Sequence, residues 1–217
     1  MSKKLLPSYV IRIVYDIIAE ETESPEALRR VFALAGLERV ADQPPPMDHS
    51  PAITLPEYQK IIGVVWQVFD EVQAREIFRR TAVRGFENLT RSNVAVFTQF
   101  LRAFDSLGTK QERVALAMSR LTDEMTRALG NKHAFRRDGE DFILDIYDCP
   151  YCAELLSRPP TVADARYCYT PVAFYEAAIS WASGDHHIVQ EIACRVITKE
   201  NFCRFKIFWN VGLKNKV

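Results

Sequence analysis

Apolar residues recur at helical spacing through most of the first 130 positions of the chain. Residues 5–20 carry them every three or four positions, with charged residues between, which predicts an amphipathic helix. Ser24 followed by Pro25 predicts the start of a second helix that ends before Gly36. Residues 42–52 contain four prolines and no periodicity, so we expect an extended linker there.

Two capping boxes mark the longer helices. Residues 54–57 and residues 109–112 each place a threonine three positions before a glutamate, so that each side chain can bind a backbone N–H at a helix start. The first is expected to start a long helix that reaches toward Gly85, and the second a helix that ends at Gly130. An apolar face over residues 97–107 predicts a further helix between them.

The apolar period changes from 3.6 to 2 near residue 132. Alternating segments on both sides of Asp138-Gly139 predict a β-hairpin. A helix over residues 170–183 is expected to follow, and then two strands, 187–197 and 202–209. This order predicts an α+β fold in which helices pack on an antiparallel sheet.

Composition narrows the classes of partner. The 28 basic residues balance the 28 acidic ones without forming a block, which argues against nucleic acid and anionic membranes as partners. Charges interrupt the N-terminal apolar run, which argues against a secretory leader or a membrane-inserted helix. We therefore expect a soluble cytoplasmic protein, with an N-terminal helical segment at 1–41 and one compact domain at 53–217.

The five cysteines suggest thiol chemistry. An odd number, with Cys149 and Cys152 in a Cys-Pro-Tyr-Cys turn, favours a reducing compartment over a disulfide framework. For this pair, metal ligands, a redox dithiol and a structural role all stay open.

A second group of residues has the composition of a metal site. Cys168, Glu191, Cys194 and Cys203 supply three thiolates and a carboxylate, a mixture that suits a closed tetrahedral zinc ion. On a regular strand Glu191 and Cys194 would point to opposite faces, so a shared ion requires a bulge or a strand end between them. Spacing alone is equally compatible with Cys194 as a small buried apolar residue and Glu191 as a solvated one.

The segment containing Cys168, Gly184, Glu191, Cys194 and Cys203-Arg204-Phe205 resembles the vinyl-4-reductase domain, also called the 4-vinyl reductase or hydrocarbon-binding domain. The resemblance extends upstream through the motif at residues 148–152 and, more loosely, to about residue 55. It implies the ligand-binding fold shared by NO-signalling and Golgi-transport proteins, often dimeric, with an apolar pocket.

The same resemblance implies a zinc ion beside that pocket, held by Cys168, Glu191, Cys194 and Cys203. The interval before Cys203 is about one residue longer here than in the family. Cys149 and Cys152 are alternative ligands.

The preferred function is a binding protein, a sensor or carrier for a hydrophobic or aromatic ligand such as a tetrapyrrole, with structural zinc. As a sensor it would act through a separate signalling protein, and as a carrier with a biosynthetic partner. Tyr147, Phe174, Tyr175 and Trp181 are the candidates for the pocket wall, because they combine apolar rings with polar tips and lie in or beside the cysteine-bearing elements.

Two other functions stay open. One is an enzyme, a vinyl reductase of bacteriochlorophyll synthesis that takes electrons from a partner or from an iron–sulfur cluster. The lack of a nicotinamide or flavin motif disfavours it. The other is a scaffold that acts mainly as a homodimer.

Overall fold

The computed structural model describes residues 5–22, 24–92, 108–159, 161–162, 164 and 166–209. The chain divides into two compact units. The first consists of Met1–Gly85 with Pro150–Thr170, and the second of Phe86–Cys149 with Pro171–Val217. The helix expected at residues 97–107 lies outside the described residues.

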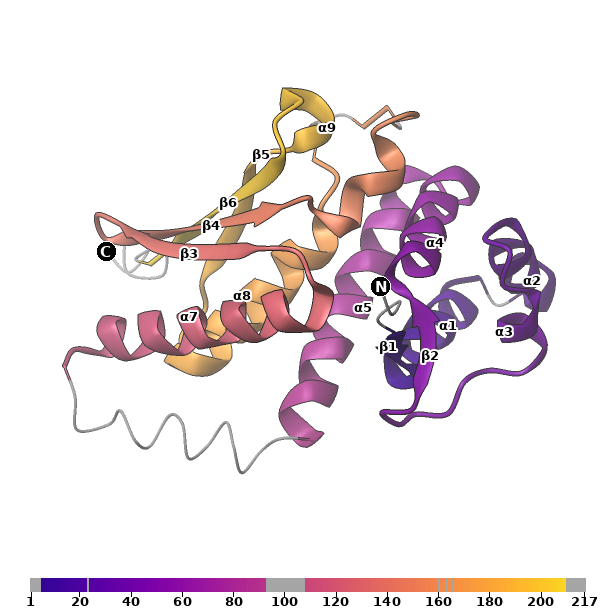
Figure 1. Ribbon diagram of the computed structural model, residues 1–217, viewed down its shortest axis with the longest axis horizontal. Helices are drawn as coiled ribbons and strands as arrows, with labels where there is room; N and C mark the ends of the chain where they lie inside the picture. The colour runs from indigo at the N-terminus through magenta and orange to yellow at the C-terminus, as the bar shows by residue number, and fades with distance from the viewer. Residues whose placement is uncertain are drawn as a thin grey trace. The chain divides into compact units, whose positions relative to one another are not determined.

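The first unit is mainly helical (Figure 1). Its elements are β1 (Leu5–Pro7), α1 (Ser8–Thr22), α2 (Pro25–Leu34), α3 (Glu38–Asp42), β2 (Pro51–Thr54), α4 (Leu55–Val68), the part of α5 (Glu71–Ser92) up to Gly85, and the 3₁₀ helix η1 (Pro150–Leu155). The helices bury apolar faces against one another, and Ile17, Phe32 and Ile61 are almost completely shielded from solvent.

Two of the predicted helix starts of this unit are confirmed. Thr54 Oγ1 accepts from Glu57 N at 3.3 Å, and Glu57 Oε2 accepts from Thr54 N at 2.7 Å, which completes the capping box of α4. Ser24 caps α2 through the N–H of Ala27, with Pro25 at the first helical position.

The long helix predicted from residue 54 toward Gly85 is two helices. α4 ends at Val68, and α5 starts at Glu71 and continues to Ser92. The Asp70 carboxylate accepts from Gln73 N at 2.8 Å, so a new N-cap interrupts an apolar stripe that runs on without a break in the sequence.

Two short strands replace the ends of predicted segments. β1 takes the first residues of the expected helix at 5–20, and β2 takes the end of the expected linker at 42–52. They pair antiparallel, with Leu6 opposite Ile53. Strands of three and four residues are too short for a period of two to be visible in a sequence.

The second unit is an antiparallel sheet with helices on one side, and Figure 1 shows α7 and α8 on that side. Its elements are α7 (Lys110–Leu129), β3 (His133–Asp138), β4 (Asp141–Tyr147), α8 (Tyr169–Ser183, in this unit from Pro171), β5 (Ile188–Ala193), α9 (Arg195–Thr198) and β6 (Phe202–Phe208). The strand order is β3-β4-β6-β5. The predicted α+β fold with helices on an antiparallel sheet is confirmed.

The predicted hairpin is also present. Asp138 pairs with Asp141 across the turn, and Gly139 has a φ of 62°, in the left-handed region that favours glycine. In the strand that follows this turn, alternate residues such as Leu144 are buried.

The strand predicted at 187–197 ends earlier. β5 stops at Ala193, and the chain then makes one short helix, α9, before Lys199 turns it back with a φ of 62°. No helix among the described residues is long and apolar enough to cross a membrane.

Candidate functional site

The second unit buries three thiols and a carboxylate near the connection between β5 and β6. Cys203 lies in β6 opposite Ile146 of β4 and has no exposed surface. Glu191 lies in β5 and Cys194 follows it, and both are buried. Cys149, just after β4, is also fully buried.

An irregularity in β5 allows Glu191 and Cys194 to face the same way. The pairing register with β6 shifts between Glu191 and Ala193, where the strand ends, and such a shift cancels one step of the strand alternation. The ligand atoms of Glu191, Cys194 and Cys203 lie within 4.8 Å of one another. Cys194 Sγ and Cys203 Sγ are 4.0 Å apart, and Cys149 Sγ lies within 4.8 Å of Cys203 Sγ.

A backbone N–H points at one of these sulfur atoms. Arg195 N donates to Cys203 Sγ at 3.4 Å, because Cys194 is the N-cap of α9 and Arg195 its first residue. The cap is fixed by Thr198 N, which donates to the Cys194 carbonyl at 2.8 Å. A hydrogen bond donated to sulfur favours the thiolate, which is the form that binds metals and reacts with oxidants.

The other two thiols belong to the first unit. Cys152 lies in η1 and Cys168 directly precedes α8; both are buried, and their Sγ atoms lie within 4.8 Å of one another. None of the five cysteines forms a disulfide. Of the predicted ligand set, the second unit therefore brings together Glu191, Cys194 and Cys203, and Cys168 stands two residues before Thr170, at the end of the first unit.

Three of the four predicted wall residues lie on α8. Tyr175 is buried, and its hydroxyl lies 2.8 Å from His133 Nδ1. Phe174 packs edge-on to Phe86 with a centroid distance of 5.6 Å, and Trp181 packs on the same ring at 6.2 Å. Trp181 remains 40% exposed, so this aromatic row of α8 extends from the interior to the surface.

Tyr147 lies apart from that row. In β4 it alternates with the buried Ile146 and shares the opposite face of the sheet with Asp145. Its ring packs on Phe202 at 5.8 Å, and the Lys132 ammonium lies 5.1 Å from its centroid. The structure does not bring Tyr147 together with the aromatic residues of α8.

His133 is a buried polar residue that the sequence analysis missed. It is 6% exposed, and its Nε2 has no hydrogen-bond partner. Burial lowers the pKa of His133 to about 4, while burial and then the charge of Cys149 raise the pKa of Tyr175, so both side chains are neutral at pH 7. The alternation through Phe135 could have located it, because His133 is two positions earlier in the same strand.

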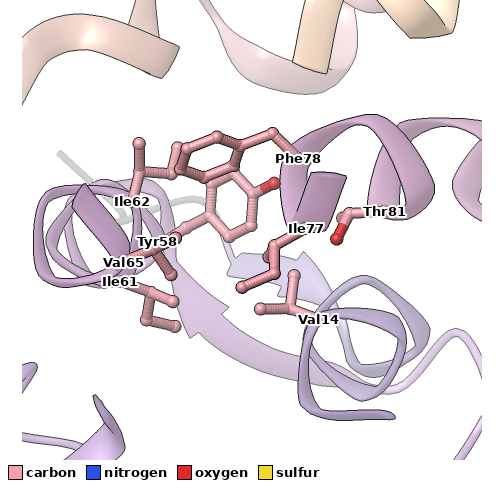
Figure 2. A pocket seen from close by; sticks show the side chains of 8 residues that line it. All are labelled: Val14, Tyr58, Ile61, Ile62, Val65, Ile77, Phe78 and Thr81. Atoms are coloured by element: carbon pink, nitrogen blue, oxygen red, sulfur yellow. The ribbon is translucent and has the colours of Figure 1, made fainter. Parts of the chain in front are cut away.

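The first unit contains a small cavity (Figure 2). Figure 2 shows its wall formed by Val14 of α1, by Ile77, Phe78 and Thr81 of α5, and by Tyr58 with aliphatic residues of α4. The volume open to the centre of a water molecule is about 10 Å³. The sequence gives no sign of it, because each of these residues has the pattern of ordinary core.

No known protein-family model and no curated protein matches this sequence. Solved structures do. An H-NOX (heme NO/oxygen-binding) protein from S. oneidensis in the Fe(II)NO ligation state has 11% identity and a TM-score of 0.55, over 94% of this chain and 98% of that one. An H-NOX protein studied for heme distortion has 10% identity, and a doubly substituted variant of the Tt H-NOX protein has 11%. Each of these two has a TM-score of 0.51 over 93% of both chains.

At this identity the likeness establishes the fold. It is the fold of NO-signalling H-NOX proteins, as the predicted fold class stated.

The resemblance to the vinyl-4-reductase domain is wrong. No family model supports it, and the similar structures are H-NOX proteins. The resemblance was most specific at a few cysteine, glutamate and glycine positions near a hairpin, where buried thiols also serve simply as small apolar residues. The predicted alternative of a vinyl reductase in bacteriochlorophyll synthesis rested on this resemblance and is therefore unsupported.

The prediction of zinc, with an iron–sulfur cluster as alternative, is contradicted by the same comparison. The similar proteins are described with heme and with an Fe(II)NO centre. Thiols and a carboxylate at suitable spacing indicate ligand chemistry, but they do not identify the cofactor of a fold.

Among the described residues, the cavity of the first unit and three of the four histidines do not fit a heme. The cavity of the first unit, at about 10 Å³, is far below the roughly 300–1,000 Å³ of a cofactor pocket. Of the four histidines, His49 and His186 are exposed, and His187 uses both ring nitrogens, on Phe208 O and on Ser183 Oγ. His133 is buried and keeps an Nε2 atom without a hydrogen-bond partner.

Proposed function

We propose that the chain is a small-molecule-binding protein, a sensor or carrier for a hydrophobic or aromatic ligand. The observation that carries the proposal is the fold shared with H-NOX structures over 94% of this chain. The proteins of those structures are described with heme and with a bound NO group. Because a fold alone does not fix a function, the residues that would contact a ligand have to be argued separately.

The aromatic row of α8 is the proposed ligand-binding surface. It consists of the rings of Phe174, Tyr175 and Trp181, which pack on one another or on Phe86. Trp181 is 40% exposed, so its ring is accessible to a ligand. Large rings contribute much apolar contact area and lose little conformational entropy on binding. The neutral Tyr175–His133 pair behind them adds hydrogen-bonding groups without a charge, which suits the apolar body of a ligand.

The predicted ligand set remains our proposal for a metal site. Glu191, Cys194 and Cys203 converge within the second unit, and a closed four-coordinate site needs one more ligand. In the set predicted from the sequence, the fourth ligand is Cys168. Cys149 and Cys152 are the alternative ligands.

A homodimer is proposed through β5. This strand is at the edge of the four-stranded sheet, and Ile188 and Ile192 on it are 38% and 48% exposed. An edge strand with exposed apolar side chains can pair with the same strand of a second copy about a two-fold axis. Light scattering after size exclusion should give twice the mass of the chain, and Ile192→Lys should give the monomer.

Ligand binding is tested by thermal melting of the full chain with heme, protoporphyrin IX or phenol. A ligand present at about 100 times its Kd stabilises a protein by about 2.7 kcal/mol. For a chain of this length that corresponds to a rise in Tm of roughly 5–10 °C. Phe174→Ala should abolish the shift, and Tyr147→Ala, on the other face of the sheet, should retain it. If none of the probes shifts the melt, the scaffold role is favoured instead.

A further inference from the structure

We propose that the four-stranded sheet binds single-stranded nucleic acid on the face that is turned away from α7 and α8. In this proposal the rings of Tyr147 and Phe202 stack on bases, and the cations around them contact phosphates. The aromatic row of α8 lies on the other side of the sheet (Figure 1). The two sites are therefore separate, and either can fail without the other.

The strand register determines which side chains share this open face. Tyr147 of β4 lies opposite Phe202 of β6, and two residues further along the strands Asp145 lies opposite Arg204. The residues between them, such as Ile146, are fully buried on the other face. The rings and cations of the open face that are at least partly exposed are Tyr147, Phe202, Phe208, Arg136, Arg204 and Lys206.

Tyr147 and Phe202 form an aromatic pair on the two internal strands of the sheet. Their ring centroids are 5.8 Å apart. The Arg204 guanidinium lies 4.7 Å from the Phe202 centroid, and its Nε and Nη2 donate to Asp145, which fixes the guanidinium plane beside the ring. Unpaired bases stack on aromatic rings and on arginine planes, and RNA-binding sheets of four strands use aromatic residues of this kind.

Cations surround the aromatic pair. Lys132 Nζ lies 5.1 Å from the Tyr147 centroid, and Arg136 and Arg204 both bind the buried Asp145. The N–H groups that the two arginines do not use on Asp145 can bind phosphate oxygens. The whole chain has as many acidic as basic residues, which predicts no nucleic-acid partner, but at this end of the open face three cations meet one buried carboxylate.

The other end of the open face has the opposite charge balance. Lys206 Nζ lies 3.1 Å from Asp141 and 3.8 Å from Asp138, so two carboxylates meet one cation there. Phe208 is a third ring on the same face, with Lys206 Nζ 5.4 Å from its centroid. Because carboxylates repel phosphates, we expect binding at the Tyr147 end, and Phe208 provides a matched control.

The rings are tested by fluorescence anisotropy of the full chain with labelled oligo(dT) and oligo(U) of about ten nucleotides. Both single strands should bind, and a DNA duplex of the same length should not, because only unpaired bases can stack on a sheet face. Phe202→Leu should weaken binding by about 5-fold to 100-fold, the effect of losing one stacked base, and Phe208→Leu should leave it unchanged. Equal affinities of these two variants, at melting temperatures that verify their folding, would overturn the proposal, and so would equal binding of the duplex.

Salt and competition test the cations. With three phosphate contacts, the logarithm of the affinity should fall with the logarithm of the salt concentration with a slope of about −2, and Lys132→Gln should reduce the slope by about 0.7. Glu200, between α9 and β6, is close enough to interact with the charge of Arg204, so Glu200→Gln should tighten binding. An affinity that does not depend on salt, or no binding of either single strand, would overturn the proposal. Polyglutamate that displaces the label as well as unlabelled oligo(U) does would assign the face to an acidic protein instead.

Discussion

Asp145 is a buried charge in an internal strand of the sheet, and its neutralisation gives a quantitative test of the structure. The side chain accepts from Arg204 Nε at 2.6 Å, from Arg204 Nη2 at 3.1 Å and from Arg136 Nη1 at 2.6 Å. The residue itself is 2% exposed, whereas the side chains of Arg136 and Arg204 are 49% and 34% exposed. Asp145→Asn therefore leaves two cations that can partly regain water.

The expected loss follows from that asymmetry. Breaking a fully buried ion pair costs about 3–5 kcal/mol, and the partial exposure of both arginines lowers this to about 2–4 kcal/mol. For a chain of this length the Tm should fall by roughly 4–16 °C. Asp138→Asn is the matched control, because Asp138 forms only an exposed pair with Lys206 at 3.8 Å and should change stability by at most about 1 kcal/mol.

The pH dependence of the Asp145 contribution has a definite sign. Burial raises the pKa of Asp145, but the hydrogen bonds and charges of Arg204 and Arg136 outweigh burial and hold it below its ordinary value. The stabilisation is therefore complete above the unfolded pKa of about 3.9 and is lost as the pH falls through the lower folded pKa. The difference between urea melts of the wild type and Asp145→Asn should be full at pH 7 and shrink progressively as the pH falls below about 4. A difference that stays constant to pH 3, or a variant that melts like Asp138→Asn, would refute this reasoning.

Three further predictions concern the buried polar groups and the caps. Tyr175→Phe should destabilise the protein by about 1–3 kcal/mol in urea melts, because His133 Nδ1 loses its buried partner. Thr54→Ala should cost about 1 kcal/mol and speed hydrogen exchange of the Glu57 amide; unchanged exchange would contradict the capping box. Cobalt(II) added to metal-free protein should give a thiolate charge-transfer band that Cys203→Ser abolishes and Cys152→Ser retains; equal bands in both variants would contradict the ligand set.

Local signals in the sequence were sufficient for much of the fold. The capping boxes at Thr54 and Thr109 and the turn at Asp138-Gly139 were predictable because their hydrogen bonds and backbone angles involve residues within three positions of one another. The break at Asp70 and the pairing of β1 with β2 were not predictable. They depend on contacts between segments, and the apolar pattern does not change there.

For the candidate site, the sequence indicated the chemistry better than the geometry. Residue types alone singled out Glu191, Cys194 and Cys203, and the need for a bulge between the first two was clear from strand alternation. The contact between His133 and Tyr175 joins residues 42 positions apart, so no local pattern shows it. The cavity beside Thr81 likewise depends on how three helices pack.

The central claim, that the second unit binds a hydrophobic or aromatic small molecule on the aromatic row of α8, is tested most directly by a tryptophan fluorescence titration. Protoporphyrin IX and heme are added to the full chain and to Trp181→Phe, which separates the signal of Trp181 from that of the other two tryptophans. The claim predicts saturable quenching that disappears in Trp181→Phe and weakens in Phe174→Ala. Quenching that is absent, or that is the same in all three proteins, would contradict it.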